Sequence, residues 1–296
     1  MSFQKKFFGK WVLAGEYSVL RKGFAIVYPL NSYSIGFKYS ESKRNLVIQK
    51  SGSYQSDLDF SITPILYKAL KFLNKKQESL KGVLEIKGDI PFGAGVGASA
   101  SLCVGIAYLF LYKKWLKRNQ VKSFASHLED FFHGKSSGMD ITSVIHKKPI
   151  LYYKGTLKNL NSFKEKPLLF LSYSGGRSAT SVGVSKVRKL FDRNWNLAES
   201  IDKQMCQSVN LCLKALKERH AKKSLSLLSQ ALDLGEDCFN KWGLISYELE
   251  QHIKELKKKG ALSTKPTGSG LGGHVISLWT IPPPSSLKEK LIPLTL

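Results

Sequence analysis

The chain is poor in acidic residues for its size. Only 22 Asp and Glu stand against 46 Lys and Arg, which gives the 296 residues a formal net charge of +24. Nucleic acid, a membrane surface or acidic small molecules could each use such a charge. The basic residues are dispersed, however, and no basic tail, zinc-binding or RNA-binding signature occurs. Composition therefore favours a solvated basic surface that attracts small anions, and we do not expect nucleic acid as a partner.

Two further absences bear on location. The longest apolar run, 102–112, is too short to span a bilayer, and the first residues lack the apolar core of a signal peptide. The four cysteines, at 103, 206, 212 and 238, show no CxxC or Cys/His metal spacing. Cys103, Cys206 and Cys212 fall in helical apolar patterns, which predicts buried free thiols and a reducing compartment. We therefore expect a cytoplasmic protein without a membrane partner.

The apolar pattern changes along the chain. Strands are predicted at 11–14, 25–28, 32–39, 83–90, 149–153 and 167–172, with helices at 62–73, 99–116 and 122–132. From Ser178 helices dominate, at 178–190, 197–218, 223–234 and 244–258, before a last strand at 275–279. These elements predict an α+β fold with a β-rich N-terminal part, 1–165, and a helix-rich C-terminal part, 166–296.

The most informative segment is Pro91–Ser101, where three glycines stand at alternate positions before small residues and a helical apolar run. Glycines let the backbone approach an anion closely, and the N–H groups at the start of the next helix point toward it. No Gly-Lys-Ser/Thr closes the segment, and its spacing does not fit a dinucleotide fingerprint. The segment predicts a polyphosphate-binding loop, with a tight turn before a buried helix as the alternative.

Two other segments weaken that alternative. One is Gly9–Leu20, which contains Gly15-Glu16-Tyr17, and the other is Lys265–Leu278, which is rich in glycine. With Pro91–Ser101 they resemble, in order and spacing, the three motifs of the GHMP kinases, small-molecule kinases named after galactose, homoserine, mevalonate and phosphomevalonate. His133–Asp140 is similar to the His-Gly-x-x-Ser-Gly-x-Asp segment of mevalonate kinases. The resemblance spans nearly the whole chain and implies the two-subdomain GHMP kinase fold, with a nucleotide-binding part at 1–165 and a substrate-binding part at 166–296.

The resemblance implies how ATP and Mg²⁺ are bound. The residues implied for the nucleotide are Gly93, Ala94, Gly95, Val96, Gly97, Ala98, Ser99, Ala100 and Ser101. Ser99 and Glu129 are implied as ligands of Mg²⁺, a cation that takes few protein oxygens and completes its shell with water and phosphate. Ala98 departs from the pattern, because mevalonate kinases usually carry a serine there. For Glu129 the alternative is a surface carboxylate beside Asp130.

The same resemblance implies the reacting groups. Asp140 would lie beside the acceptor hydroxyl as a general base, with Lys10 nearby to keep the carboxylate ionised. A helix cap for Asp140 and a solvated strand-end lysine for Lys10 are the alternatives. Substrate binding is implied for Glu16, Tyr17, Ser137, Gly138, Arg177, Thr267 and Gly268. Tyr17 stands where mevalonate kinases commonly carry histidine, and for Arg177 a surface position is the alternative.

The acceptor is less well specified than the reaction. His133–Asp140 and the Gly-Leu-Gly-Gly form of the third motif resemble bacterial mevalonate kinases most, which implies mevalonate. Ala14–Tyr17 and Tyr173–Ser181 resemble phosphomevalonate kinases, so phosphomevalonate is the alternative acceptor. A catalytically silent relative and a nucleic-acid-binding protein stay open as other classes. The sequence does not determine the oligomeric state, and a homodimer is one option.

Overall fold

A computed structural model of the chain describes residues 2–21, 23–134 and 136–296. The fold divides into two compact units, each built from several segments. Unit 1 consists of Met1–Lys10, Pro29–Phe92 and Gly97–Lys147. Unit 2 consists of Trp11–Tyr28, Gly93–Val96 and Lys148–Leu296.

Regular elements make up most of the described chain. The strands are β1 (Ser2–Ala14), β2 (Ala25–Asn45), β3 (Val47–Ser51), β4 (Lys81–Asp89), β5 (Ile150–Tyr153), β6 (Thr156–Asn159), β7 (Leu168–Tyr173), β8 (Ser263–Thr267), β9 (His274–Trp279) and β10 (Leu291–Pro293). The α-helices are α1 (Gln55–Phe72), α2 (Ala98–Tyr112), α3 (Val121–His133), α4 (Met139–His146), α5 (Thr180–Arg193), α6 (Trp195–Lys217), α7 (Ala221–Lys241) and α8 (Tyr247–Lys258). Short 3₁₀ helices are η1 (Ser18–Leu20), η2 (Gln77–Ser79), η3 (Arg118–Gln120) and η4 (Ser285–Lys290).

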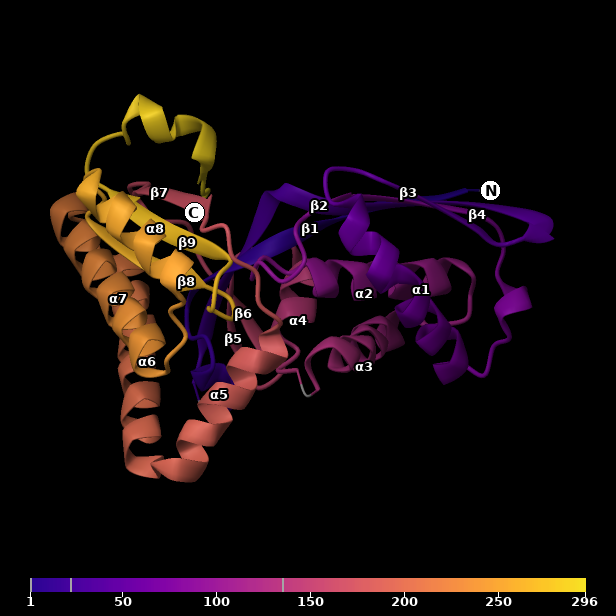
Figure 1. The fold of residues 1–296 in the computed structure, drawn as a ribbon, viewed down its shortest axis with the longest axis horizontal. Helices are drawn as coiled ribbons and strands as arrows, with labels where there is room; N and C mark the ends of the chain where they lie inside the picture. Colours follow the sequence, from indigo (N-terminus) through magenta and orange to yellow (C-terminus); the bar gives the residue numbers. More distant parts are fainter. Residues whose placement is uncertain (1, 22, 135) are drawn as a thin grey trace. The chain divides into compact units, whose positions relative to one another are not determined.

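Unit 1 is a layer of strands with helices on one side (Figure 1). Strand β4 lies between β3, its parallel neighbour, and the later part of β2, its antiparallel neighbour. Side chains of β4 alternate between buried and more exposed positions, as a strand with one covered face requires. Helices α1, α2 and α3 pack together, and α2 is buried on nearly all sides. The strongly apolar composition of α2 explains this burial, because the helix presents no polar face to water.

Unit 2 is built on a second sheet, whose order is β10-β7-β9-β8 with antiparallel neighbours throughout. Strand β9 is buried along its whole length. Helices α6 and α7 pack along each other, and α7 and α8 contact β8. One apolar core of this unit includes Val187, Ile201, Met205, Phe239 and Trp242, which come from α5, α6 and the end of α7. The sequence pattern of α6, with one apolar stripe, predicts this packing.

The α+β class and the change from strands to helices along the chain are confirmed. The compact units do not follow a single cut between residues 165 and 166, because β1 and β2 each continue from one unit into the other. The apolar pattern does not predict the short elements β3, α4, β6, β8 and β10, which offer too few residues for a period to show. The assignment of nucleotide and substrate to the two parts stays a prediction.

The cysteines and the apolar helices follow the sequence expectations with one exception. Cys103, Cys212 and Cys238 are buried free thiols. Cys206 is only half-buried, so the prediction of burial is wrong for this residue, which lies beside the apolar stripe of α6 rather than within it. Among the described residues, no helix combines the length and the apolar character that crossing a membrane requires.

The packing of α2 against β2 predicts a large effect of a single methyl group. A Cβ on Gly105 would lie 2.0 Å from the ring of Phe37, which is itself 1% exposed. We expect Gly105→Ala to lower the free energy of unfolding by about 1–3 kcal/mol, the usual cost of overpacking a core. Chemical denaturation followed by circular dichroism measures this. Gly36→Ala is the matched control, because its Cβ would meet only Lys87 Cβ at 3.8 Å; equal effects of the two variants would contradict the packing described.

Candidate active site

Two oppositely charged side chains meet in unit 1. The ammonium nitrogen of Lys10 lies 3.0 Å from Oδ2 of Asp140, and the two side chains are 3% and 23% exposed. Lys10 is the last unit 1 residue of β1, and Asp140 stands in the first turn of α4. Gly138 caps this helix with a φ of 73°, a left-handed conformation that glycine adopts without strain. The structure thus brings the two predicted reacting groups into contact, at a helix end whose dipole favours a carboxylate.

Glu129 is buried beside this pair. It lies on α3 with 1% exposure, and burial together with the nearby Asp140 carboxylate raises its pKa well above the usual range. Lys10 and Ser136 favour the ionised form, yet no described residue makes a hydrogen bond of ordinary length to either Glu129 oxygen. Oδ1 of Asp140 is also buried, and it too receives no hydrogen bond of ordinary length from the described residues. The alternative of a surface carboxylate for Glu129 is excluded, and buried carboxylate oxygens without donors favour a cation.

Ser99 shares one face of α2 with Cys103, a thiol on which the Glu129 carboxylate acts. Ser99 and Cys103 are four residues apart in α2, so their side chains share one face of the helix. Burial and then the charge of Glu129 raise the pKa of the Cys103 thiol, which shows that Glu129 is near this face. The hydroxyl of Ser99 is half-buried one turn before Cys103. The two residues predicted to bind Mg²⁺ therefore come from packed helices, α2 and α3.

The glycine segment forms a loop with left-handed residues at alternate positions. Gly93, Gly95 and Gly97 have φ angles of 70°, 79° and 83°. Side chains are excluded as well, because a Cβ on Gly97 would lie 2.9 Å from Cγ of Lys10. A Cβ on Gly95 would lie 2.5 Å from the carbonyl oxygen of Thr267. Gly97 therefore lets the stem of Lys10 pass in unit 1, and Gly95 lets the third glycine segment approach in unit 2.

The predicted nucleotide-binding residues at the start of α2 differ in burial. Ser101 is fully buried, its hydroxyl donates to the carbonyl of Phe8 at 3.0 Å, and its N–H donates to the carbonyl of Gly97. Ser101 therefore anchors α2 to β1. Ala98 and Ala100 are buried too, whereas Ser99 is half-buried. A phosphate at this helix would meet the N–H groups that precede Ser101, which have no acceptor within the helix itself.

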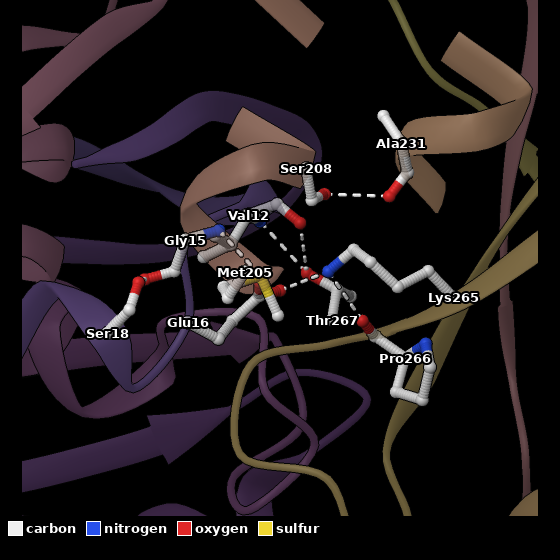
Figure 2. Close-up of polar contacts among 10 residues, drawn as sticks. All are labelled: Val12, Gly15, Glu16, Ser18, Met205, Ser208, Ala231, Lys265, Pro266 and Thr267. Atoms are coloured by element: carbon white, nitrogen blue, oxygen red, sulfur yellow. Dashed lines mark hydrogen bonds and ion pairs between the residues drawn. The ribbon is translucent and has the colours of Figure 1, made fainter. Parts of the chain in front are cut away.

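The third motif is joined to the end of β1 in unit 2 (Figure 2). The hydroxyl of Thr267 accepts from the N–H of Val12 at 2.9 Å and donates to the carbonyl of Val12 at 3.0 Å. Gly268 packs against the backbone of Gly95, where a Cβ would lie 2.5 Å from Gly95 Cα. The Thr267 hydroxyl thus acts both as a donor and as an acceptor toward the backbone of β1. The prediction of substrate binding by Thr267 and Gly268 gains no support from these contacts.

Glu16 and Tyr17 are also engaged within unit 2. The buried carboxylate of Glu16 accepts a hydrogen bond from the ammonium of Lys265 (Figure 2). The hydroxyl of Tyr17 donates to the carbonyl of Ser269 at 2.5 Å, and its ring packs edge-on against Trp242. Sequence reasoning did not assign a role to Lys265, because β8 is too short to be predicted from its pattern and the burial of this lysine appears only in the fold.

The remaining predicted residues are Ser137, at the start of α4, and Arg177, near Gly93. The hydroxyl of Ser137 accepts from the N–H of Met139 at 3.2 Å and so helps to begin α4. Arg177 is exposed, and a Cβ on Gly93 would lie 3.6 Å from its Cβ. The N–H of Ser178 donates to the carbonyl of Gly93 at 3.0 Å. Arg177 thus stands beside the glycine loop in unit 2.

A histidine supports the same loop from β9. Nδ1 of His274 lies 2.9 Å from the carbonyl of Ala94, a distance at which the ring donates. Burial lowers the pKa of His274 to about 4, so the ring is neutral at pH 7. A Cβ on Gly273 would lie 2.8 Å from the same carbonyl oxygen. The loop residues of unit 2 therefore rest on the turn between β8 and β9.

Chemically, unit 1 joins a carboxylate that can accept a proton, an ammonium that can stabilise negative charge, and a buried carboxylate that favours a cation. The start of α2 adds N–H groups that favour an anion. Within the described residues, no cluster of three or more His, Cys, Asp or Glu side chains forms a metal site by itself. Such a set suits a cation that is held partly by a phosphate ligand.

Comparison with known proteins finds relatives of this sequence. Residues 64–148, which include the loop, Glu129 and Asp140, match the family described as GHMP kinases N terminal domain. Mevalonate kinase of Archaeoglobus fulgidus is 26% identical over 274 residues, 92% of this chain and 90% of that protein.

Solved structures share the fold over nearly the whole chain. L. major mevalonate kinase in complex with R-mevalonate has a TM-score of 0.75 at 22% identity, covering 97% of this chain and 89% of that one. Streptococcus pneumoniae phosphomevalonate kinase has a TM-score of 0.68 at 17% identity, covering 95% and 92%. Residues 64–148 thus match the N-terminal domain of the GHMP kinases, and the chain shares the fold of solved mevalonate kinases over nearly its whole length.

Proposed function

We propose that the chain is a mevalonate kinase, which transfers the γ-phosphoryl group of ATP to the primary hydroxyl of mevalonate. The observation that carries the proposal is the contact of Lys10 with Asp140 beside the buried Glu129. The names of curated relatives support it, including the Archaeoglobus fulgidus enzyme. A solved relative of the same fold contains R-mevalonate.

Phosphoryl transfer needs positioning and charge stabilisation more than covalent help from the protein. The carboxylate of Asp140 takes the proton of the acceptor hydroxyl, and the acceptor oxygen forms a bond to the γ-phosphorus. The bond from that phosphorus to the bridging oxygen of the β-phosphate breaks, and ADP leaves. The ammonium of Lys10, held 3.0 Å from Asp140, stabilises negative charge on the acceptor oxygen.

The residues present fit Mg²⁺, because Glu129 and Asp140 bury carboxylate oxygens that receive no hydrogen bond of ordinary length from the described residues. Glu129 and Ser99 would hold the ion. When bound, Mg²⁺ would neutralise charge on the phosphate oxygens of ATP. Backbone N–H groups of Gly93–Ala100 bind the phosphates, and the N-terminus of α2 favours their charge.

Phosphomevalonate is the second candidate acceptor. The segment Tyr173–Ser181 resembles phosphomevalonate kinases, and a solved phosphomevalonate kinase shares the fold. Arg177 beside Gly93 could grip either a carboxylate or a phosphate with its planar fork. A lone arginine suits the single carboxylate of mevalonate better than the added dianion of phosphomevalonate, so we favour mevalonate. Location in the cytoplasm and a homodimer remain predictions from the sequence.

The first prediction concerns the proton acceptor. Asp140→Asn should lower kcat by about 10²–10⁴-fold, the usual scale for loss of a general base, because the amide cannot accept the proton. A coupled ATPase assay with mevalonate measures kcat, and calorimetry with ATP checks that nucleotide binding persists. Asp59→Asn is the control, since the Asp59 carboxylate pairs with Lys50 on the surface. Full activity of the Asp140 variant would contradict the assigned role, and inactivity of the parent would favour a silent relative.

The second prediction concerns the metal. Glu129→Gln and Ser99→Ala should each raise the Mg²⁺ concentration for half-maximal activity by about tenfold or more, because each removes an oxygen ligand from a sparse site. Mn²⁺ binding in the presence of ATP, followed by paramagnetic resonance, gives a second readout that does not depend on turnover. Glu41→Gln is the control, because Glu41 pairs with Lys113 and is 54% exposed. Parent-like metal titrations of both variants would make these residues structural.

The third prediction concerns the acceptor. The ratio kcat/KM should favour mevalonate over phosphomevalonate by about 10²-fold or more, since a pocket built for a hydroxyl does not desolvate a phosphate dianion. Arg177→Ala should raise KM for mevalonate while kcat changes less, because a carboxylate contact far from the reacting oxygen contributes to binding. Preference for phosphomevalonate that is lost in Arg177→Ala would make phosphomevalonate the substrate.

A further inference from the structure

Lys265 is a fully buried lysine whose partners are all within unit 2. Its ammonium bonds to the carboxylate of Glu16 and donates to the carbonyl of Pro266 at 2.8 Å (Figure 2). It also lies 5.3 Å from the centroid of the Phe239 ring. Burial lowers the pKa of Lys265, and the Glu16 carboxylate opposes this effect. An ion pair that is 0% and 3% exposed is costly to form, because both charged groups lose their contact with water.

The pair belongs to a series of contacts along β8. Lys265 and Thr267 are two residues apart in a strand, so their side chains point to the same face. Lys265 holds Glu16, just after β1, and Thr267 holds both backbone groups of Val12 within β1. Figure 2 shows the Lys265 and Thr267 side chains reaching Glu16 and Val12 from one strand. Two anchors on one face fix the register of β8 along this segment.

The far end of β8 meets the glycine loop. The carbonyl oxygen of Thr267 occupies the place that a Cβ on Gly95 would need, and Gly268 packs on the same glycine. A shift of β8 by one residue would replace these contacts and leave the ammonium of Lys265 and the carboxylate of Glu16 buried without each other. Unpaired buried charges are strongly unfavourable. The ion pair therefore selects one position of β8 against Gly95.

We propose that Lys265 is a positioning residue for the nucleotide: through Glu16 it sets the place of β8, and β8 sets the conformation of loop residues Gly93–Val96. The proposal rests on the proposed function, in which this loop binds the phosphates of ATP. Glu16 is then the partner of Lys265 and does not bind the substrate. Apolar residues could stabilise unit 2 as well as the pair does, but a shifted strand would then not carry the added cost of two unpaired buried charges.

The test separates stability from nucleotide binding. Lys265→Met leaves the Glu16 charge buried, so it should lower Tm and weaken MgATP binding. The double variant Lys265→Met with Glu16→Leu removes both charges and should recover Tm, yet its Kd for MgATP should stay about tenfold above the parent, because the loop is misplaced. Calorimetry on folded protein measures Kd, and circular dichroism measures Tm. Lys203→Met with Glu199→Leu is the matched control, an exposed ion pair on α6 that should change neither value.

A further variant, Glu16→Gln, and a further measurement, hydrogen exchange, keep the proposal testable if the other variants do not fold. Glu16→Gln keeps an acceptor oxygen for Lys265, so it should fold and raise Kd by about threefold. If Kd of this variant and of the double variant equals that of the parent, Lys265 is only structural. Hydrogen exchange at the amides of 94–96 should be faster in the double variant than in the parent, without any ligand. A parent that binds no MgATP would overturn the proposed function, while the exchange result would still decide the role of Lys265.

Discussion

The close approach of the backbone at two glycines is the constraint on which the candidate site depends. Gly97 leaves room for the stem of Lys10, and Gly95 leaves room for the carbonyl of Thr267. Both glycines also have positive φ, so any side chain would add strain to a clash. Within unit 1, Gly97 therefore allows the close approach of Lys10, and within unit 2, Gly95 allows the close approach of Thr267, because neither glycine has a side chain.

Buried charge is used sparingly and in pairs. Lys10 is buried against a partly exposed Asp140, whereas Lys265 and Glu16 contact each other with almost no exposure to water. Glu129 differs, because its pKa is raised and its oxygens lack ordinary hydrogen bonds among the described residues. The first pair suits chemistry, since Asp140 is partly exposed, whereas the second is closed and suits structure. The difference in exposure distinguishes the pair that we propose to react from the pair that we propose to position the loop.

The departures from the family pattern have local explanations. Tyr17 replaces the common histidine, and its ring fills a core with Trp242 while its hydroxyl reaches Ser269. The neighbour of that ring, Gly183, has no side chain, and a Cβ there would lie 2.1 Å from the Tyr17 hydroxyl. The tyrosine is thus accommodated by glycine on α5. Ala98, where a serine is usual, is buried at the start of α2 and adds no polar group.

The sequence by itself determined the α+β class, the order of most elements and the glycine loop, because periodicity and glycine spacing are local properties. It also indicated Lys10, Asp140, Ser99 and Glu129 through a resemblance between motifs. Tertiary structure decided what the motif residues touch. Glu16, Tyr17 and Thr267 hold strands and turns together instead of facing outward, and Lys265 emerged as the partner of Glu16. These contacts join residues about 250 positions apart, and no local pattern records which distant group will satisfy a buried charge or hydroxyl.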